Sequence, residues 1–301
     1  MAMAIEARGL QKRFGQCWVL RGLDLKVPRG SIYGLVGRNG AGKTTLLRIL
    51  LGIIRPDDGD VFVDGVPAGE SNPEWKGSIG YVPDVPDVYY NLRVSEFFAL
   101  GKRFYSKWDE ETMARLVGLL GLPLKRRLRE LARGQRTLAA LVFALSHHPS
   151  YLFLDEPTAG LDPLVRREVL KLVLEEAAEH GTTVIYSTHI LADLERACDR
   201  IGLLHGGTIA VEKAIDELKA DARRIQVVWE GEPPEDPSTW PEIAACGRRG
   251  RVWSLTVTEN AARVVDKIKA ARATFFEELP LSLEDWFIAS VGRDVQHEKN
   301  S

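Results

Sequence analysis

The nine residues "GRNGAGKTT", from Gly37 to Thr45, constrain the fold of this chain more than any other segment. They follow an apolar run, "SIYGLV", that we expect to be a buried strand, and they lead into "LLRILLGII", whose apolar residues recur at helical spacing. A strand, a glycine-rich loop ending in Lys-Thr, and a helix together form the phosphate-binding loop pattern. An isolated glycine turn would lack these flanks. The segment therefore predicts a nucleoside triphosphate site in an α/β fold.

Each residue type in the loop has a chemical property that suits phosphate or metal binding. The glycines let the backbone curl so that amide hydrogens point at phosphate oxygens. Lys43 would place a positive charge near the β- and γ-phosphates, and Thr44 would offer a hydroxyl to Mg²⁺. The positive end of the following helix adds to the attraction. The predicted binding residues are Gly37, Arg38, Asn39, Gly40, Ala41, Gly42, Lys43, Thr44 and Thr45.

The segment "YLFLDEP" predicts the second half of the same site. Asp155 ends an apolar strand, where it would hold Mg²⁺ directly or through water. Glu156 follows it, and a carboxylate there can orient or deprotonate an attacking water. An acidic pair that only ends a strand is the alternative for an isolated "DE". The complete phosphate loop upstream favours the catalytic interpretation, with ATP and Mg²⁺ as cofactors.

Around these motifs, strands alternate with helices, which predicts a mostly parallel sheet with crossover helices. The first thirty residues predict an antiparallel subdomain of short strands, and residues 86–146 predict a helical insert. After about residue 214 a proline-rich, acidic loop separates strand-like from helical runs. We therefore expect an ATP-binding domain over 1–214 and a small α+β appendage over 215–301.

Composition limits the partners that the protein can bind and the cellular compartment in which we expect it. The net charge of −2 argues against a dominant nucleic-acid surface. Three widely spaced cysteines favour free thiols in a reducing compartment over a disulfide scaffold. No apolar run approaches the roughly 18 residues that would span a bilayer, and the N-terminus lacks the blocks of a signal peptide. We expect a cytosolic protein whose membrane role, if any, comes through a partner.

The order of five motifs resembles the nucleotide-binding subunit of ABC transporters: the phosphate loop, the helical insert, "LARGQ", "YLFLDEPTAGLDP" and "YSTH". The resemblance extends from about Ile5 to Lys213. It implies that two such domains meet head to tail, as a homodimer or with a related subunit, and enclose two ATP molecules. Each ATP would lie between one subunit's phosphate loop and the other subunit's signature turn. It also implies a membrane permease as partner, with this chain on the inner face of the cell membrane.

The resemblance gives roles to three further residues. Phe14 in "KRFG" stands where the family stacks an aromatic ring on adenine, although an aromatic near a strand end is often core. Asp162 in "AGLDP" matches the turn that helps link the two sites across the dimer. His189 in "YSTH" matches the histidine that contacts the γ-phosphate and the attacking water, although a lone histidine at a strand end is usually structural.

The first departure from the family pattern is Asp84, where the turn after "GYVP" normally presents glutamine. An ionised aspartate keeps an oxygen and adds charge for a metal, but it lacks the amide donor and one methylene of reach. Asp84 is thus expected to contact metal or water, or else to be a simple turn residue beside Pro83.

The second departure is the signature turn, where the family has serine and glycine and this chain has Ala132 and Arg133. Ala132 lacks the hydroxyl, whose bond to a charged phosphate contributes about 1.5–3 kcal/mol, and alanine is a poor N-cap. Gly134 and Gln135 are unchanged. Arg133 would either offset part of the loss with its guanidinium or be an exposed arginine at a helix start. The sequence predicts closure on ATP that is weaker than with serine.

Taken together, these features predict an ATPase subunit that drives a separate membrane permease. The tail "LPLSLEDWFIASVG" is similar to that of ATPases serving bacterial exporters, which favours export over import. One alternative is an ATPase of the same type acting on ribosomes or DNA. Another is an ATP-binding regulator with weak hydrolysis, for which Asp84 and Ala132 leave room.

Overall fold

The computed structural model describes residues 2–68, 74–86 and 89–290, which form two compact units, Met1–Glu212 and Lys213–Ser301. The centre of the first unit is a six-stranded sheet in the order β10-β9-β3-β8-β7-β6. β3, β8, β7, β6 and β9 pair in parallel, as the alternation of strands and helices predicts. The strands are β3 (Ile32–Val36), β6 (Ile79–Val82), β7 (Tyr151–Asp155), β8 (Thr183–Ser187), β9 (Arg200–His205) and β10 (Thr208–Ala214).

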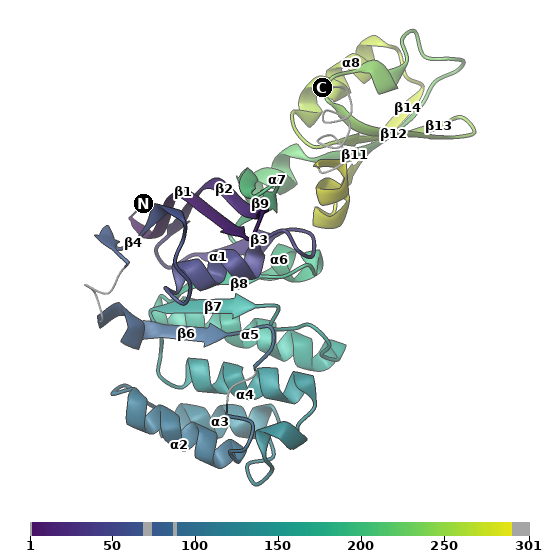
Figure 1. The fold of residues 1–301 in the computed structure, drawn as a ribbon. Coiled ribbons are helices and arrows are strands. Elements are labelled where there is room, and N and C mark those ends of the chain that lie inside the picture. The colour runs from purple at the N-terminus through teal and green to yellow at the C-terminus, as the bar shows by residue number, and fades with distance from the viewer. Residues whose placement is uncertain (1, 69–73, 87–88, 291–301) are drawn as a thin grey trace. The chain divides into compact units, whose positions relative to one another are not determined.

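The sheet is buried because its middle strands are mostly apolar, with polar residues only at the ends of β7 and β8. Every residue of β3, β7 and β8 is buried, as expected for parallel strands covered on both faces. The covering helices of this unit are α1 (Lys43–Leu50), α5 (Pro163–His180) and α6 (Leu191–Ala197). α1 starts at the end of β3 and α5 starts after β7, so the loops at these strand ends lie at one edge of the sheet (Figure 1).

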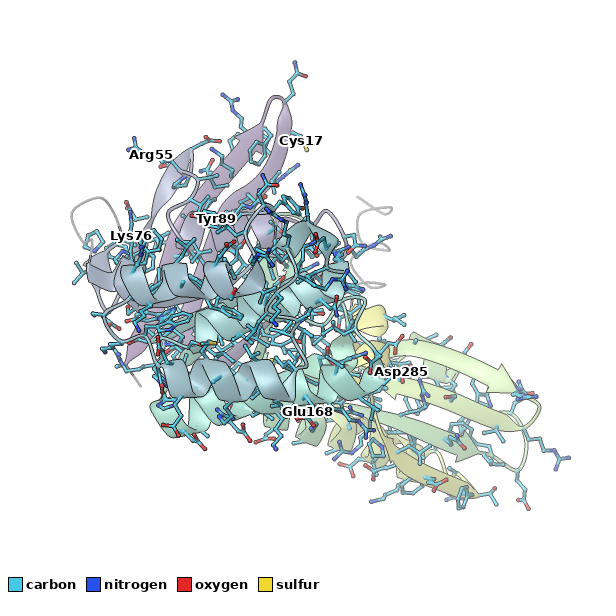
Figure 2. All side chains as sticks on the ribbon, turned by 90° about the horizontal axis from the view of Figure 1, so that it is seen from below. Cys17, Arg55, Lys76, Tyr89, Glu168 and Asp285 are labelled. Carbon is cyan, nitrogen blue, oxygen red and sulfur yellow. The ribbon has the colours of Figure 1, made fainter. Side chains whose placement is uncertain are left out.

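An antiparallel sheet in the order β2-β1-β4-β5 forms the second layer of this unit. The sequence predicted short strands here, but β1 (Met3–Phe14) and β2 (Cys17–Pro28) have 12 residues each. Gly9 and Gly22 have positive φ values, and both lie at register shifts of the β1–β2 pair. A glycine with positive φ thus accommodates a bulge and not a turn. β4 (Asp58–Val63) and β5 (Val66–Pro67) complete the sheet, and Figure 2 shows Cys17 at the tip of the β1–β2 hairpin.

Three helices form the helical insert that was predicted over residues 86–146. Residues 87 and 88 of that range lie outside the described part of the chain. They are α2 (Val94–Phe104), α3 (Glu110–Leu119) and α4 (Arg133–Leu145). One 3-10 turn, η1 (Glu74–Ser78), precedes the insert, and another, η2 (Leu128–Glu130), lies between α3 and α4. α4 lies between the sheet and the α2–α3 pair (Figure 1). Phe97 of α2 stacks on Phe143 of α4, with 4.6 Å between ring centroids. The edge strand β6, four residues long, was not predicted from the sequence.

The second unit is a small α+β fold. Its antiparallel sheet has the order β12-β13-β11-β14, and its core contains Ile225, Val227, Leu255 and Val264. Two of the strands, β12 and β14, and the helix α7 were missed by the sequence analysis. The elements are α7 (Ile215–Asp221), β11 (Arg223–Val228), η3 (Pro237–Thr239), β12 (Ile243–Arg249), β13 (Val252–Val257), α8 (Ala261–Ala270), β14 (Phe275–Pro280) and a helix over 283–290. Across both units, no helix in the described ranges is long and apolar enough to cross a membrane.

Candidate nucleotide site

The phosphate loop has the backbone that its glycines permit. Gly40 and Gly42 have φ values of 81° and 106°, a region that side chains rarely adopt. Gly42 is also the N-cap of α1, and a Cβ there would lie 2.9 Å from Cγ1 of Val19. At Gly37 a Cβ would lie 2.8 Å from the carbonyl oxygen of Leu204. The loop therefore presents bare backbone, as phosphate binding requires.

Lys43, the first residue of α1, folds back over the loop. Its Nζ donates to the carbonyl oxygen of Gly37 at 2.9 Å and lies 3.6 Å from Oε1 of Glu156. The side chain is only 7% exposed. A buried ammonium needs anionic or carbonyl partners, and here the loop and the carboxylate supply them. Lys43 thus connects the two halves of the site that the sequence predicted separately.

Asp155 is the most deeply buried carboxylate of the cleft, at 1% exposure. Among the described residues, neither of its carboxylate oxygens has a hydrogen-bond partner. Burial raises the pKa of this carboxyl, while the neighbouring hydroxyls of Thr44 and Ser187 lower it. A buried carboxylate with free lone pairs and a threonine hydroxyl beside it is a donor set that suits a hard divalent cation. These residues therefore fit Mg²⁺.

Glu156 is held in a fixed position by the end of the next strand. Its φ of 52° is in the left-handed region, which is uncommon for a residue with a side chain. Its Oε2 accepts hydrogen bonds from Oγ1 of Thr188 at 3.1 Å and from the main-chain N–H of His189 at 3.3 Å. The same oxygen lies 2.8 Å from Nδ1 of His189. With Nδ1 donating to the carboxylate, a neutral imidazole keeps its free lone pair on Nε2.

Most of these groups line one cleft of about 380 Å³, while Gly37, Thr188 and His189 lie behind it and contact its lining residues Lys43 and Glu156. Phe14 lies at its rim and is 54% exposed, so it is not a core residue. Thr188, which the sequence analysis did not single out, contributes through its hydrogen bond to Glu156. The residues that line the cleft are Phe14, Val19, Asn39, Gly40, Gly42, Lys43, Thr44, Thr45, Asp84, Asp155 and Glu156.

The signature turn begins α4, and it is not among the residues that line this cleft. Ala132 occupies the N-cap without a side-chain hydrogen bond, while Oε1 of Gln135 accepts from the main-chain N–H of Ala132 at 3.3 Å. A Cβ at Gly134 would lie 2.7 Å from Cδ2 of Leu161, so the turn packs closely on the "AGLDP" segment. Asp162, in the same segment, caps α5 by accepting from the main-chain N–H groups of residues 164 and 165.

The two departures from the family pattern contact each other. Arg133 donates to the carboxylate of Asp84 and, at 3.4 Å, to its main-chain carbonyl oxygen. Both side chains are partly exposed. Spacing along the chain gave no sign of this ion pair, because the residues are 49 positions apart. The signal that was present was chemical: one departure adds a negative charge and the other adds a positive charge.

A phosphate-binding loop, a buried carboxylate and a second carboxylate bonded to a histidine meet at one cleft, and together they define a phosphate-loop nucleoside triphosphatase. Comparison with known proteins narrows the class. The family model described as ABC transporter matches residues 20–159. The ABC transporter ATP-binding protein YtrB of Bacillus subtilis is 31% identical over 96% of this chain and 98% of its own length. The Nod factor export ATP-binding protein I of a Rhizobium species is 32% identical over 98% of this chain and 99% of its own length.

Solved structures agree with this assignment. The ATP-binding subunit of an ABC transporter matches with a TM-score of 0.65 and 27% identity, over 72% of this chain and 92% of that chain. A dimeric ATP-binding cassette bound to ADP and Pi matches with a TM-score of 0.64 and 21% identity. A likeness at this identity supports the fold alone. The chain belongs to the ATP-binding subunits of ABC transporters, and it is an ATPase.

The contact between Asp84 and Arg133 predicts a small, measurable coupling. Because both side chains are partly exposed, Asp84→Ala and Arg133→Ala should each lower the free energy of unfolding by no more than about 1 kcal/mol. The double variant should show a coupling energy of about 0.2–1 kcal/mol that decreases at high salt. Urea unfolding of the four proteins at two salt concentrations measures it. Additive single effects at low salt would show that the pair does not form.

Proposed function

We propose that this chain is the energy-coupling ATPase of a bacterial exporter and drives a separate membrane permease through ATP-dependent dimer closure. The observation that carries the proposal is the joint presence of the phosphate loop, the unpaired carboxylate of Asp155 and the Glu156–His189 pair in one cleft. Relatives named for bacitracin transport and for Nod factor export support the export direction. The protein would act at the cytoplasmic face of the cell membrane, bound to the permease.

Each residue of the cleft has a defined task in this proposal. Lys43 and the loop amides bind the β- and γ-phosphates, and Phe14 stacks on adenine. Thr44, Asp155 and Asp84 hold Mg²⁺, which when bound neutralises charge on the phosphate oxygens. Glu156 positions water for in-line attack and accepts its proton. His189 fixes the carboxylate by donating its Nδ1–H, and its Nε2 accepts a hydrogen bond from the attacking water beside the γ-phosphate. Thr188 keeps the same carboxylate oriented.

Dimer closure would bring the signature turn of a second subunit to this cleft. In a homodimer, the main-chain N–H groups at the start of α4, with Gly134 and Gln135, would bind the partner-bound γ-phosphate. Arg133 would then contact phosphate or ribose, and Asp162 would contribute at the same interface. Because Arg133 pairs with Asp84 in the single chain, closure would exchange that carboxylate for the nucleotide. The exchange conserves one charge-assisted contact for Arg133.

A groove of about 320 Å³ beside the cleft is the surface on which we place the permease. It is predominantly aromatic and aliphatic, and its lining includes Tyr89 and Phe104, which are exposed. An exposed apolar groove of this kind suits a short amphipathic helix from a partner. Pro83 and Pro86 of the groove flank Asp84 of the cleft. Occupation of the groove would therefore act on the segment that carries Asp84.

Glu156→Gln should lower ATP turnover at least about 100-fold while leaving ATP affinity within a few-fold of the unchanged protein. The amide retains the volume of the carboxylate but cannot accept a proton from water. Phosphate release and nucleotide binding measure the two effects. Glu168→Gln, at a half-buried position of α5 that does not line the cleft, is the matched control and should hydrolyse normally. Unchanged turnover in Glu156→Gln would contradict the proposed role of this carboxylate.

Ala132→Ser should tighten ATP-dependent dimerisation about tenfold or more, because the hydroxyl adds a bond to a charged phosphate and an N-cap. Sedimentation of the variants in a Glu156→Gln background, where ATP persists, measures the dimer constant. Ala132→Gly, which also lacks a hydroxyl, is the control and should not show this gain. A dimer constant unchanged by serine would exclude Ala132 from the closed interface.

Phe104→Asp should reduce recovery of a multi-spanning membrane protein that co-purifies with the tagged chain from detergent-solubilised membranes. The carboxylate would have to be desolvated in the apolar groove. Phe275→Asp, at an exposed position in the second unit, is the control and should leave recovery unchanged. Recovery of only ribosomal or nucleic-acid partners would overturn the transporter proposal in favour of an ATPase acting on those substrates.

A further inference from the structure

Three side chains with metal-binding chemistry gather at a second place in the first unit. They are His148, Glu176 and His180, and one potential ligand atom from each lies within 4.8 Å of the others. None of the three lines the nucleotide cleft. His148 lies in the turn between α4 and β7, and the other two lie on α5. The motifs that identified the ATPase use none of these residues.

The local sequence explains why the three side chains meet. Glu176 and His180 are four residues apart on α5, so they share one face of the helix. Gly181 ends that helix in the left-handed conformation, which leaves His180 as its last residue. His148 also has a positive φ, 48°, and its ring centroid lies 4.5 Å from that of His180.

His148 is already oriented as a metal ligand. Its Nε2 lies 3.1 Å from Oδ2 of Asp109. That carboxylate is itself fixed, since it accepts from Oγ1 of Thr112 at 2.7 Å and from two main-chain N–H groups. Asp109 therefore accepts a hydrogen bond from Nε2–H, which leaves the lone pair of the neutral ring on Nδ1. The Nδ1 atom is buried and has no hydrogen-bond partner. A carboxylate behind a histidine is the arrangement that orients histidine ligands in metal proteins.

Glu176 is a buried carboxylate without a strong donor. Its side chain is 7% exposed. Oγ1 of Thr182 lies 3.2 Å from its Oε1, but the same hydroxyl lies 2.7 Å from the carbonyl oxygen of Pro149. A hydroxyl has one hydrogen, and the shorter contact to Pro149 takes it. The other oxygen, Oε2, is 4.0 Å from Nε2 of His180. Buried carboxylates are usually paired or bound to a cation.

We propose that His148, Glu176 and His180 bind one divalent transition-metal ion, with Zn²⁺ as the best chemical match, and that solvent completes the tetrahedron. Two imidazoles and one carboxylate suit zinc, whereas Mg²⁺ and Ca²⁺ prefer all-oxygen sites. Zinc bonds of about 2.0–2.1 Å place neighbouring donor atoms about 3.3 Å apart. His180 is partly exposed at the end of its helix, so rotation of its side chain can close the remaining gap.

The ion would join the turn after α4 to the end of α5. α4 begins at the signature turn, and α5 begins at Asp162, so the metal would connect the far ends of two helices that start beside each other. Partial exposure of His148 and His180 provides the entry path for the ion. The proposal does not depend on the exporter function, and it concerns an ion other than the Mg²⁺ of the nucleotide cleft.

Zinc titration of the full chain, without nucleotide and after chelator treatment, tests the proposal. All proteins carry Cys17→Ser, because the exposed thiol of Cys17 would compete for zinc. Competition with a chromophoric chelator should give one zinc per chain, and Co²⁺ should give the visible absorption of a tetrahedral site. His180→Ala should weaken zinc binding at least tenfold and reduce the rise in melting temperature that zinc produces. His205→Ala, which removes a partly exposed histidine elsewhere, should bind zinc like the parent.

Asp109→Asn tests the positioning role of the carboxylate behind His148. Loss of this hydrogen-bond acceptor should weaken zinc affinity about 10–100-fold while the stoichiometry stays at one. Because His180 is exposed, His180→Ala is not expected to unfold the protein, and circular dichroism checks this. Equal zinc affinity in the parent, His180→Ala and His205→Ala would overturn the proposal, as would the failure of the parent to bind zinc. Neither result would bear on ATP hydrolysis.

Discussion

Parallel hydrogen bonding among β3, β8 and β7 is the constraint on which the nucleotide site depends. Ser187, the last residue of β8, is in register with Leu35 on one side and with Asp155 on the other. The phosphate loop, Asp155 with Glu156, and Thr188 with His189 therefore leave the sheet at the same edge. Three segments that are distant in sequence meet there because their strands pair in parallel and are fully buried. A slip in register would separate the loop from its carboxylates.

Electrostatics within the cleft follow from this placement. Lys43 lies between the loop and Glu156, while Asp155, one residue earlier, has no cation in contact and is more deeply buried. Two adjacent carboxylates thus have different surroundings, which fits one for metal binding and the other for proton transfer. Asp84 adds a third negative charge to the cleft, and Arg133 compensates for it from the start of α4.

The sequence predicted the features that are local. The phosphate loop, "LDEP" and the long helices depend on residues within one or two turns of each other, and their positions were predicted well. The short strands β6, β12 and β14 were missed, because four to seven residues at a sheet edge carry little periodicity. The length of β1 and β2 was misjudged because Gly9 and Gly22 accommodate bulges. The Asp84–Arg133 pair and the His148–Glu176–His180 cluster were invisible, since each depends on tertiary contacts between distant segments.

The close contact between Gly134 and Leu161 has a consequence for how this subunit moves. Leu161 precedes the cap of α5, and α5 has 18 residues, so it is a rod about 27 Å long. Any side chain larger than hydrogen at position 134 would push on the start of that rod. The turn that we propose to meet a second subunit's nucleotide therefore packs directly on the start of the helix that follows Glu156. A displacement of the turn would reach the far end of α5 without passing through the nucleotide cleft.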